Sequence, residues 1–366
     1  ILAVSAVALL GLSSCSKWTD MEIQHPMDLT KPAHTEEYYK ALRDYKNSDH
    51  QIAFAYYSAW TGVGTNMQSS LMGLPDSVDL VSLWGGWKNP TEAQLKDLRL
   101  AQEKKGLKAM ICFLVLDMGN GVTPDPTDAE KAQLKEGEKW THKYWGWSNE
   151  QTEAGKAARR AAVVKYANAI CDLIDKYGYD GFDLDAEPSY AQPFQTDKEL
   201  WQNAKVMEAF VKTMGKRIGP KSGTDKMFVI DGEPDAMAAQ YGEYFNYFIL
   251  QAYSSSDNSD LNSRFTAQAT HFQQYLTPEQ VANKLIVCEN FENYAGKGGV
   301  SFRLDNGKTL PSLLGMAYWN PVYNGVTYRK GGVGTYHMEY EYTVSGQTGN
   351  YPFLRKAIQI MNPSIQ

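Results

Sequence analysis

The sequence predicts a single (β/α)8 barrel, and three observations lead to this fold class. The 366 residues are 43% hydrophobic and 12% aromatic, which is enough to bury a large core and excludes a disordered chain. Short β-rich runs alternate with amphipathic segments, as in βα units around a parallel sheet. Eight such runs occur, which is the number of strands in this barrel.

The predicted strands are nearly continuous apolar runs, as expected of strands buried on both faces. They cover residues 52–58, 78–84, 107–116, 179–187, 227–231, 247–253, 284–290 and 313–319. Helices are predicted at 92–105, 153–177 and 200–217, with Gly178 after the second and Gly219-Pro220 after the third as stop signals. A doubly wound open sheet is the alternative, but no glycine-rich phosphate loop follows the first strand.

The longest connection, residues 117–149, follows the third predicted strand and carries Trp140, Tyr144, Trp145 and Trp147. Loops that follow strands form the active face of such a barrel, so we expect this aromatic loop to border the active-site cleft. The alternative is that its tryptophans only close a lid onto the domain.

The N-terminal residues have the pattern of a targeting segment. Residues 1–14 are predicted to be a signal peptide, because the apolar run has secretory length and is too short to span a bilayer. The run ends in Leu12-Ser13-Ser14-Cys15, which resembles the bacterial lipobox, so Cys15 is expected to carry lipid. A plain signal peptide with a chance cysteine is the alternative. Residues 15–48 are predicted to be a polar tether with a short helix around 36–45, and 49–366 the barrel.

Charge and cysteine content exclude several classes of partner. Lys and Arg number 36 against 42 Asp and Glu, a net charge of -6, so no attraction to nucleic acid is expected. Cys112, Cys171 and Cys288 are an odd number without CxxC spacing, which favours buried free thiols over disulfides or zinc. No metal or cofactor is expected. We expect a monomer at the cell envelope, as an outer-membrane lipoprotein on the cell surface.

The fourth predicted strand carries an unusual series of acids. Side chains alternate along a strand, so Asp183, Asp185 and Glu187 project to one side and the apolar residues between them to the other. Three acids therefore face the barrel interior, where crowding raises at least one carboxyl pKa toward that of a general acid. A calcium loop is disfavoured, because it needs turn residues between its ligands.

The series Asp180-x-x-Asp183-x-Asp185-x-Glu187 resembles the signature of glycoside hydrolase family 18. The resemblance implies a (β/α)8 barrel and a retaining mechanism in which the substrate's own 2-acetamido oxygen is the nucleophile. It implies that Glu187 is the general acid and that Asp185 orients the acetamido group and stabilises the oxazolinium ion. Asp183 would lie beneath and share a proton or hydrogen bond with Asp185.

Two more strand ends extend the resemblance. The sixth ends in Gln251-Ala252-Tyr253, where a family tyrosine donates its hydroxyl to the acetamido carbonyl. The eighth predicted strand ends in Trp319, which matches the family's tryptophan floor under the reacting sugar, with Tyr57 expected beside it.

Departures from the chitinase pattern narrow the implied substrate. Strand three lacks the Ser-x-Gly-Gly turn, and Gln251-x-Tyr253 is more similar to endo-β-N-acetylglucosaminidases than to the Met-x-Tyr-Asp of chitinases. The resemblance implies hydrolysis of the GlcNAc-β-1,4-GlcNAc core of N-glycans on glycoproteins, with complex-type glycans favoured. The predicted lipoprotein is similar to glycan-harvesting family 18 proteins of Bacteroidetes.

Other functions remain open. A different barrel glycosidase class would pair Glu187 with a nucleophile at Glu289, but it usually has Asn where this chain has Ala186. A chitinase and a surface glycan-binding protein without catalysis are further alternatives. Asp231, Glu233 and Glu292 are interpreted as glycan contacts or ion-pair partners.

Overall fold

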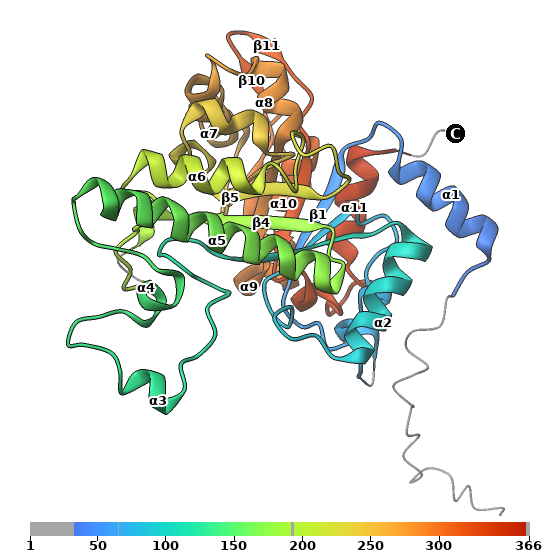
Figure 1. The fold of residues 1–366 in the computed structure, drawn as a ribbon. Coiled ribbons are helices and arrows are strands. Elements are labelled where there is room, and N and C mark those ends of the chain that lie inside the picture. The colour runs from blue at the N-terminus through green and yellow to red at the C-terminus, as the bar shows by residue number, and fades with distance from the viewer. Residues whose placement is uncertain (1–32, 65, 192–193, 364–366) are drawn as a thin grey trace, which may run out of the picture.

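The chain folds into a closed barrel of eight parallel strands surrounded by helices (Figure 1). The computed structural model of the protein describes residues 33–64, 66–191 and 194–363. Around the barrel the strand order is β1-β12-β7-β6-β5-β4-β3-β2. The predicted (β/α)8 fold is therefore confirmed.

The barrel strands are short, and each neighbouring pair is parallel. Their bounds are β1 Ile52–Tyr57, β2 Leu80–Leu83, β3 Lys108–Leu114, β4 Gly181–Ala186, β5 Met227–Gly232, β6 Phe248–Leu250, β7 Leu285–Asn290 and β12 Gly332–Tyr336. Two small hairpins lie outside the barrel and pair β8 Ser301–Arg303 with β9 Thr309–Pro311 and β10 Val322–Tyr323 with β11 Val326–Thr327.

The helices cover the outside of the barrel. They are α1 Glu36–Lys46, α2 Glu92–Leu100, α3 Asp128–Lys131, α4 Trp140–Trp145, α5 Glu153–Tyr177, α6 Ala204–Met214, α7 Asn258–Phe272, α8 Pro278–Lys284, α9 Phe291–Tyr294, α10 Ser312–Tyr318 and α11 Pro352–Met361. The bounds of α5 match the prediction, and it ends at Gly178 in the left-handed conformation. The connections from β1 to β2 and from β5 to β6 contain 3₁₀ turns instead of α-helices.

Seven predicted strands are confirmed and the eighth is wrong. Residues 312–318 form α10, and the eighth barrel strand is β12. Its glycines are needed for close packing: a Cβ at Gly332 would lie 2.0 Å from the carbonyl oxygen of Ile52, and one at Gly334 2.6 Å from the ring of Phe54. Glycine dilutes the apolar signal that identifies strands, so the sequence pattern led to the neighbouring apolar helix.

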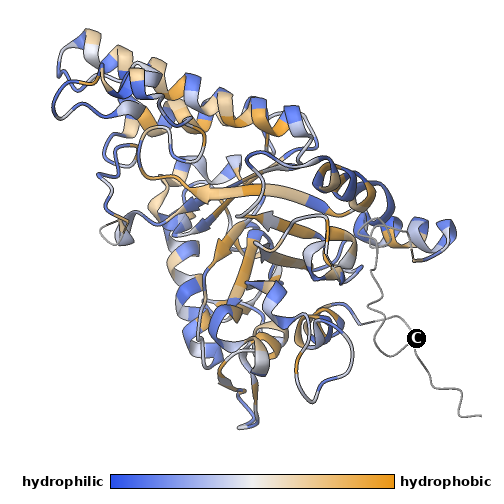
Figure 2. Cartoon of the chain, turned by 90° about the horizontal axis from the view of Figure 1, so that it is seen from below, coloured by the Kyte–Doolittle hydropathy of each residue, from blue (hydrophilic) through white to orange (hydrophobic). Residues whose placement is uncertain are grey.

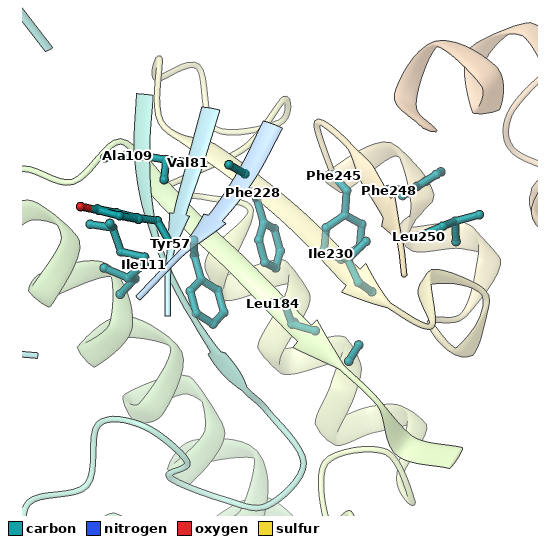
Figure 3. Packing of buried hydrophobic residues seen from close by; sticks show 14 of the residues in the cluster. Tyr57, Val81, Ala109, Ile111, Leu184, Phe228, Ile230, Phe245, Phe248 and Leu250 are labelled. Atoms are coloured by element: carbon teal, nitrogen blue, oxygen red, sulfur yellow. The ribbon is translucent and has the colours of Figure 1, made fainter. Parts of the chain in front are cut away.

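The core has two parts. The larger part lies between the barrel and its helices, where Leu184, Phe228 and Phe248 pack outward from their strands (Figure 3). The smaller part fills the barrel and includes Tyr56 and Cys112. Apolar strands inside and polar helix faces outside are clear in Figure 2. This arrangement confirms the predicted division of strand four into an outward apolar face and an inward acidic face.

The first described helix packs against the barrel. On α1, Tyr39 is buried, Arg43 Nη1 donates to the carbonyls of Glu103 and Lys104, and Lys46 Nζ donates to the carbonyl of Val78 at 2.5 Å. The predicted short helix is therefore present but belongs to the folded domain. Cys15 lies outside the described residues, and within those residues no helix has the length and apolarity to cross a membrane.

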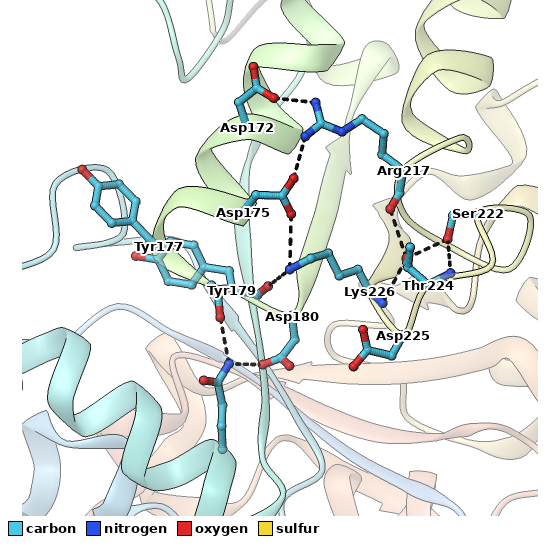
Figure 4. Close-up of polar contacts among 12 residues, drawn as sticks. Asp172, Asp175, Tyr177, Tyr179, Asp180, Arg217, Ser222, Thr224, Asp225 and Lys226 are labelled. Atoms are coloured by element: carbon cyan, nitrogen blue, oxygen red, sulfur yellow. Dashed lines mark hydrogen bonds and ion pairs between the residues drawn. The ribbon is translucent and has the colours of Figure 1, made fainter.

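The first acid of the sequence motif, Asp180, joins neighbouring elements at the entry to β4 (Figure 4). Its Oδ2 accepts hydrogen bonds from the backbone N–H of Ala109 at 2.8 Å and from Nε2 of Gln102 at 2.7 Å. Its Oδ1 accepts one from Nζ of Lys108 at 3.3 Å. Gly181 follows because a Cβ there would lie 2.1 Å from the carbonyl oxygen of Met227 on β5. The Asp-Gly pair therefore serves the assembly of β3, β4 and β5.

We predict that Asp180→Ala lowers the free energy of unfolding by about 1–3 kcal/mol, because it leaves the partly buried Ala109 N–H without its acceptor. Asp180→Asn should recover most of the loss, since an amide oxygen can still accept this bond. Urea denaturation measures both effects. Asp225→Ala is the control, because Asp225 is 87% exposed and contacts the same Lys108 only at 3.7 Å. Equal stability of Asp180→Ala and Asp225→Ala would contradict the assignment.

Candidate active site

A pocket of about 460 Å³ opens at the carboxyl ends of the barrel strands. Its walls come from strands far apart in the sequence, because parallel strands bring their carboxyl ends to one face. It is lined by Tyr56, Trp84, Cys112, Phe113, Leu114, Asp185, Glu187, Phe194, Asp231, Gln251, Tyr253 and Tyr336. Four of the residues predicted from the sequence, Asp185, Glu187, Gln251 and Tyr253, therefore share one pocket.

The acids of β4 extend from the barrel interior to this pocket. Asp183 is fully buried and accepts a 2.5 Å hydrogen bond from Oγ of Ser82. Burial raises the pKa of Asp183 despite that hydrogen bond, and the charge of Asp185 raises it further. Burial also raises the pKa of Asp185, and the charge of Glu187 adds to this effect. The inward orientation and raised pKa values predicted for this strand are confirmed.

A fourth carboxyl, Asp231 on β5, lies beside Asp185. The two residues are directly paired across the strands, and the Oδ1 atom of each is buried without a hydrogen-bond partner among the described residues. Asp231 Oδ2 also accepts the hydroxyl of Tyr56 at 2.5 Å and lies 3.8 Å from Sγ of Cys112. Burial raises the pKa of Asp231 well above its usual range, followed by the charges of Asp185 and Asp183. A protonated Asp231 can thus donate to an ionised Asp185.

Glu187 occupies a more open position at the end of the strand. Burial raises the pKa of its carboxyl, a hydrogen bond with Gln251 lowers it, and the charge of Glu233 raises it. The net upward shift keeps a larger fraction of Glu187 protonated near neutral pH than for an ordinary glutamate. This carboxyl has the properties of a general acid.

Three aromatic rings form one wall of the pocket. Tyr253 stacks on Tyr336 with ring centroids 5.9 Å apart and an interplanar angle of 27°. Tyr336 in turn packs against Trp84, with ring centroids 5.4 Å apart. Trp84 is 37% exposed. Burial raises the pKa of Tyr253 well above its usual range, so its hydroxyl remains a proton donor. The wall combines an apolar surface for a sugar ring with a hydroxyl donor.

The comparison with known families decides the identity at this point. The sequence model "Glycoside hydrolase family 18, BT1044-like" matches residues 16–360. This chain belongs to glycoside hydrolase family 18. The acids of β4 lie within the matched residues.

The relatives of this family 18 protein include an endoglycosidase and two solved structures. Endo-beta-N-acetylglucosaminidase F2 of Elizabethkingia meningoseptica is 26% identical over 334 residues, which cover 87% of this chain and 84% of that protein. A solved BT1044 variant is 29% identical, with a TM-score of 0.73 and coverage of 93% and 96% of the two chains. An endo-beta-N-acetylglucosaminidase from Cordyceps militaris shares the fold, with 21% identity, a TM-score of 0.59 and coverage of 91% and 98%.

Two predicted site residues of this family 18 chain lie elsewhere. Trp319 follows α10, is buried, and donates Nε1 to Oδ1 of Asn262 on α7 at 2.9 Å, so it cannot form a floor under a sugar. Tyr57 points outward from β1 and donates to the carbonyl of Gln68 (Figure 3). Its neighbour Tyr56 points inward, because adjacent residues of a strand face opposite sides.

The rival pairing of Glu187 with Glu289 is not supported by the geometry. Glu289 is fully buried and does not line the pocket. Its Oε1 accepts the backbone N–H of Ser254 at 2.9 Å and of Asn290 at 2.7 Å, and its Oε2 accepts the hydroxyl of Ser312. Glu289 thus holds the turn at Ser254, which follows Tyr253 directly, and its carboxylate is not available as a nucleophile.

The expectation that the aromatic loop 117–149 borders the pocket is wrong. All of these residues are described, and none lines the pocket. Trp145 packs on Tyr166 of α5, with ring centroids 5.7 Å apart, and Trp140 donates to the carbonyl of Pro124. Figure 1 shows α3 projecting away from the barrel. The alternative in which the tryptophans close the loop onto the domain fits better.

Sequence reasoning missed several pocket residues. Tyr336 was overlooked with its glycine-rich strand, and Asp231 was interpreted only as a glycan contact or ion-pair partner. Trp84 stands at the end of the second predicted strand, a position that could have identified it. For Asp231 the available signal was its place at the end of the fifth predicted strand.

One cluster has a composition that could bind a metal. Ligand atoms of Cys112, Asp183 and Asp231 lie within 4.8 Å of one another. Metal ligation needs deprotonated side chains, but burial raises the pKa of the Cys112 thiol, and of Asp231, well above their usual ranges. Without a cation, the Cys112 thiol and the Asp231 carboxyl therefore keep their protons. The three cysteines of the described residues are buried and free, as predicted.

We predict that Asp231→Asn changes how stability depends on pH. A buried carboxyl with a raised pKa keeps a proton that the unfolded chain releases, so the free energy of unfolding falls as pH rises above about 4. The amide does not titrate, so the variant lacks this loss. Between pH 4.5 and pH 8 its free energy of unfolding should therefore rise relative to that of wild type, by about 1.4 kcal/mol for each pH unit by which the fold raises the pKa of Asp231.

Urea denaturation at the two pH values gives the comparison. Asp225→Asn is the matched control, because that side chain is 87% exposed. If the free energy of unfolding changes by the same amount between the two pH values in wild type and in Asp231→Asn, Asp231 titrates as an ordinary surface acid and the prediction is wrong.

Proposed function

We propose that this family 18 hydrolase is an endo-β-N-acetylglucosaminidase that cleaves the GlcNAc-β-1,4-GlcNAc core of N-glycans with retention of configuration. The single observation that carries the proposal is the shared pocket of Glu187, Asp185 and Tyr253. It provides an acid, a partner for the acetamido group and a hydroxyl donor around one sugar-sized space.

The proposed reaction begins with attack by the substrate. The acetamido carbonyl oxygen bonds to C1 of the sugar, the bond from C1 to the bridging oxygen breaks, and Glu187 gives its proton to that leaving oxygen. Water then bonds to C1 of the oxazolinium ion and loses a proton to the Glu187 carboxylate, while the bond from C1 to the acetamido oxygen breaks and the 2-acetamido group is restored. Because two displacements occur at C1, the configuration is retained.

Asp185 and Tyr253 hold the nucleophile in this scheme. An ionised Asp185 accepts a hydrogen bond from the acetamido N–H and stabilises the positive charge that develops on this nitrogen as the oxazolinium ring forms. The Tyr253 hydroxyl donates to the acetamido oxygen. Two donors inside the barrel favour ionised carboxylates in this scheme. A protonated Asp231 can donate to Asp185, and the Ser82 hydroxyl donates to Asp183. Asp183 is thus a positioning residue and not a contact of the sugar.

The aromatic wall takes the place that was expected for Trp319. Tyr336 stands at the end of the true eighth strand, where it stacks on Tyr253. We assign Tyr336 and Trp84 as the apolar surface against the sugar ring. Beyond Glu187 a second cleft of about 760 Å³, with Tyr190, Glu233 and Arg264 in its wall, offers space for the leaving GlcNAc and its attached chain.

The proposed substrate class is supported by one relative, whose name is Endo-beta-N-acetylglucosaminidase F2. We favour complex-type glycans over high-mannose glycans. The deciding measurement is intact mass spectrometry of one glycoprotein of each type after incubation with the protein. A product that retains one GlcNAc on Asn identifies the reaction, and the glycoprotein that yields it identifies the glycan class.

We predict that Glu187→Gln lowers the rate by about 10²–10⁴-fold or more while glycan binding remains, because the amide keeps the shape and loses the proton. Glu153→Gln is the control, since this α5 side chain is 86% exposed. Full activity of Glu187→Gln would refute the assignment. Cleavage of chitin oligomers alone would identify a chitinase, and binding without cleavage by wild type would identify a glycan-binding protein.

We also predict opposite pH shifts for the two neighbours of Glu187. Activity needs the protonated acid, so it is lost as pH rises through the pKa of Glu187. Gln251→Met removes a hydrogen bond that lowers this pKa and should move the alkaline limb of kcat/KM to higher pH. Glu233→Gln removes a charge that raises it and should move the limb to lower pH. Shifts in the same direction would contradict the role of Glu187.

A further inference from the structure

A third hollow of about 450 Å³, which we call the polar cleft, lies among loops that follow β3 and β4, on the face of the barrel that holds the catalytic pocket. Its walls are the segment of residues 137–151, which includes α4, the loop at residues 197–203, and Arg159 of α5. The loop at residues 197–203 is tied to the end of β3 by Leu200 N, which donates to the carbonyl of Leu116, and by Trp201 Nε1, which donates to that of Val115. The end of β3 therefore connects the two hollows, because its residues Cys112, Phe113 and Leu114 line the catalytic pocket.

The walls of the polar cleft are held in place by the protein itself. Glu199 accepts hydrogen bonds from Lys139 Nζ and His142 Nε2, both at 2.7 Å, and from the backbone N–H of Met118 at 3.2 Å. The side chain of Glu199 is only 11% exposed. A wall fixed in advance reduces the entropy that a ligand must lose on binding.

Four amide side chains of the cleft each have one end anchored. Asn149 Oδ1 accepts from Trp147 Nε1, and Asn203 Oδ1 accepts the first N–H groups of α6. Gln151 Nε2 donates to the carbonyl of Asn149, and Gln202 Nε2 donates to that of Asp197.

The other end of each amide bonds to no residue within 33–64, 66–191 and 194–363. These ends are the Nδ2 donors of Asn149 and Asn203 and the Oε1 acceptors of Gln151 and Gln202. Two donors and two acceptors suit a ligand whose groups both donate and accept, which is the property of sugar hydroxyls.

The charge of the cleft indicates an uncharged ligand. Lys139 bonds to both carboxylates of the wall, Asp197 and Glu199, and Arg159 donates to the backbone carbonyls of Ser148 and Glu150. The two cations and the two carboxylates among the lining residues balance, so the cleft carries no net charge from them that would select an anion. Trp147, half-buried against His142 with ring centroids 5.6 Å apart, adds a fixed aromatic surface.

We propose that the polar cleft is a second saccharide-binding site, which holds an uncharged hexose or N-acetylhexosamine unit of the same branched glycan whose core occupies the catalytic pocket. The assignment to one glycan rests on the proposed function. The aromatic loop then contributes to substrate recognition at this cleft, although it does not line the catalytic pocket.

The test uses the full chain with Gln151 and Gln202 both replaced by Met, which keeps side-chain length and removes the two acceptors. Loss of these bonds should raise KM for a branched N-glycan about tenfold relative to KM for the same core trimmed of its branches. Gln133→Met, on the same loop and exposed, is the matched control and should leave that ratio unchanged. An unchanged ratio in the double variant would overturn the proposal.

A binding measurement separates this proposal from the proposed function. The branched glycan, released from protein, is titrated calorimetrically into Glu187→Gln with and without the two Met substitutions. Weaker binding with the substitutions supports the cleft even if wild type cleaves no N-glycan. Equal affinity overturns the cleft even if wild type is an active endoglycosidase.

Discussion

The structure depends on one constraint: three aspartates must share the interior of a closed barrel. Asp183, Asp185 and Asp231 have little water around them, so their charges repel strongly unless protons are shared. The hydroxyls of Ser82 and Tyr56 each supply one short hydrogen bond to this group. A barrel without a catalytic site would fill this space with apolar side chains. The buried acids lower the free energy of unfolding, and this cost indicates that they serve a reaction.

Closure of the barrel sets the position of every group around these acids. β12 closes the cylinder between β1 and β7, and its glycines let the neighbouring strands approach. This places Tyr336 against Tyr253, although 83 positions separate them in the chain (336 minus 253). Glu289, at the end of β7, holds the turn that follows Tyr253. The pocket is thus assembled from strand ends, and buried hydrogen bonds in the wall keep those ends in register.

The loops at the carboxyl ends of the barrel strands line two different hollows. The loop after β4 lines the catalytic pocket through Phe194 and the polar cleft through residues 197–203. Glu199 joins this loop to the aromatic loop after β3 by charge-assisted hydrogen bonds. A glycan that contacts both hollows would therefore meet loops that part-buried polar contacts join to each other.

The sequence by itself determined the barrel, seven of its strands and the inward column from Asp183 to Glu187, because strand periodicity and apolar runs are local properties of the chain. Only the tertiary structure decided which strand closes the barrel, that Tyr56 and not Tyr57 faces inward, and that Trp319 packs against α7. It also brought Asp231 to Asp185. These features depend on contacts between distant segments and on close packing at glycines, which leave no periodic signal in a single sequence.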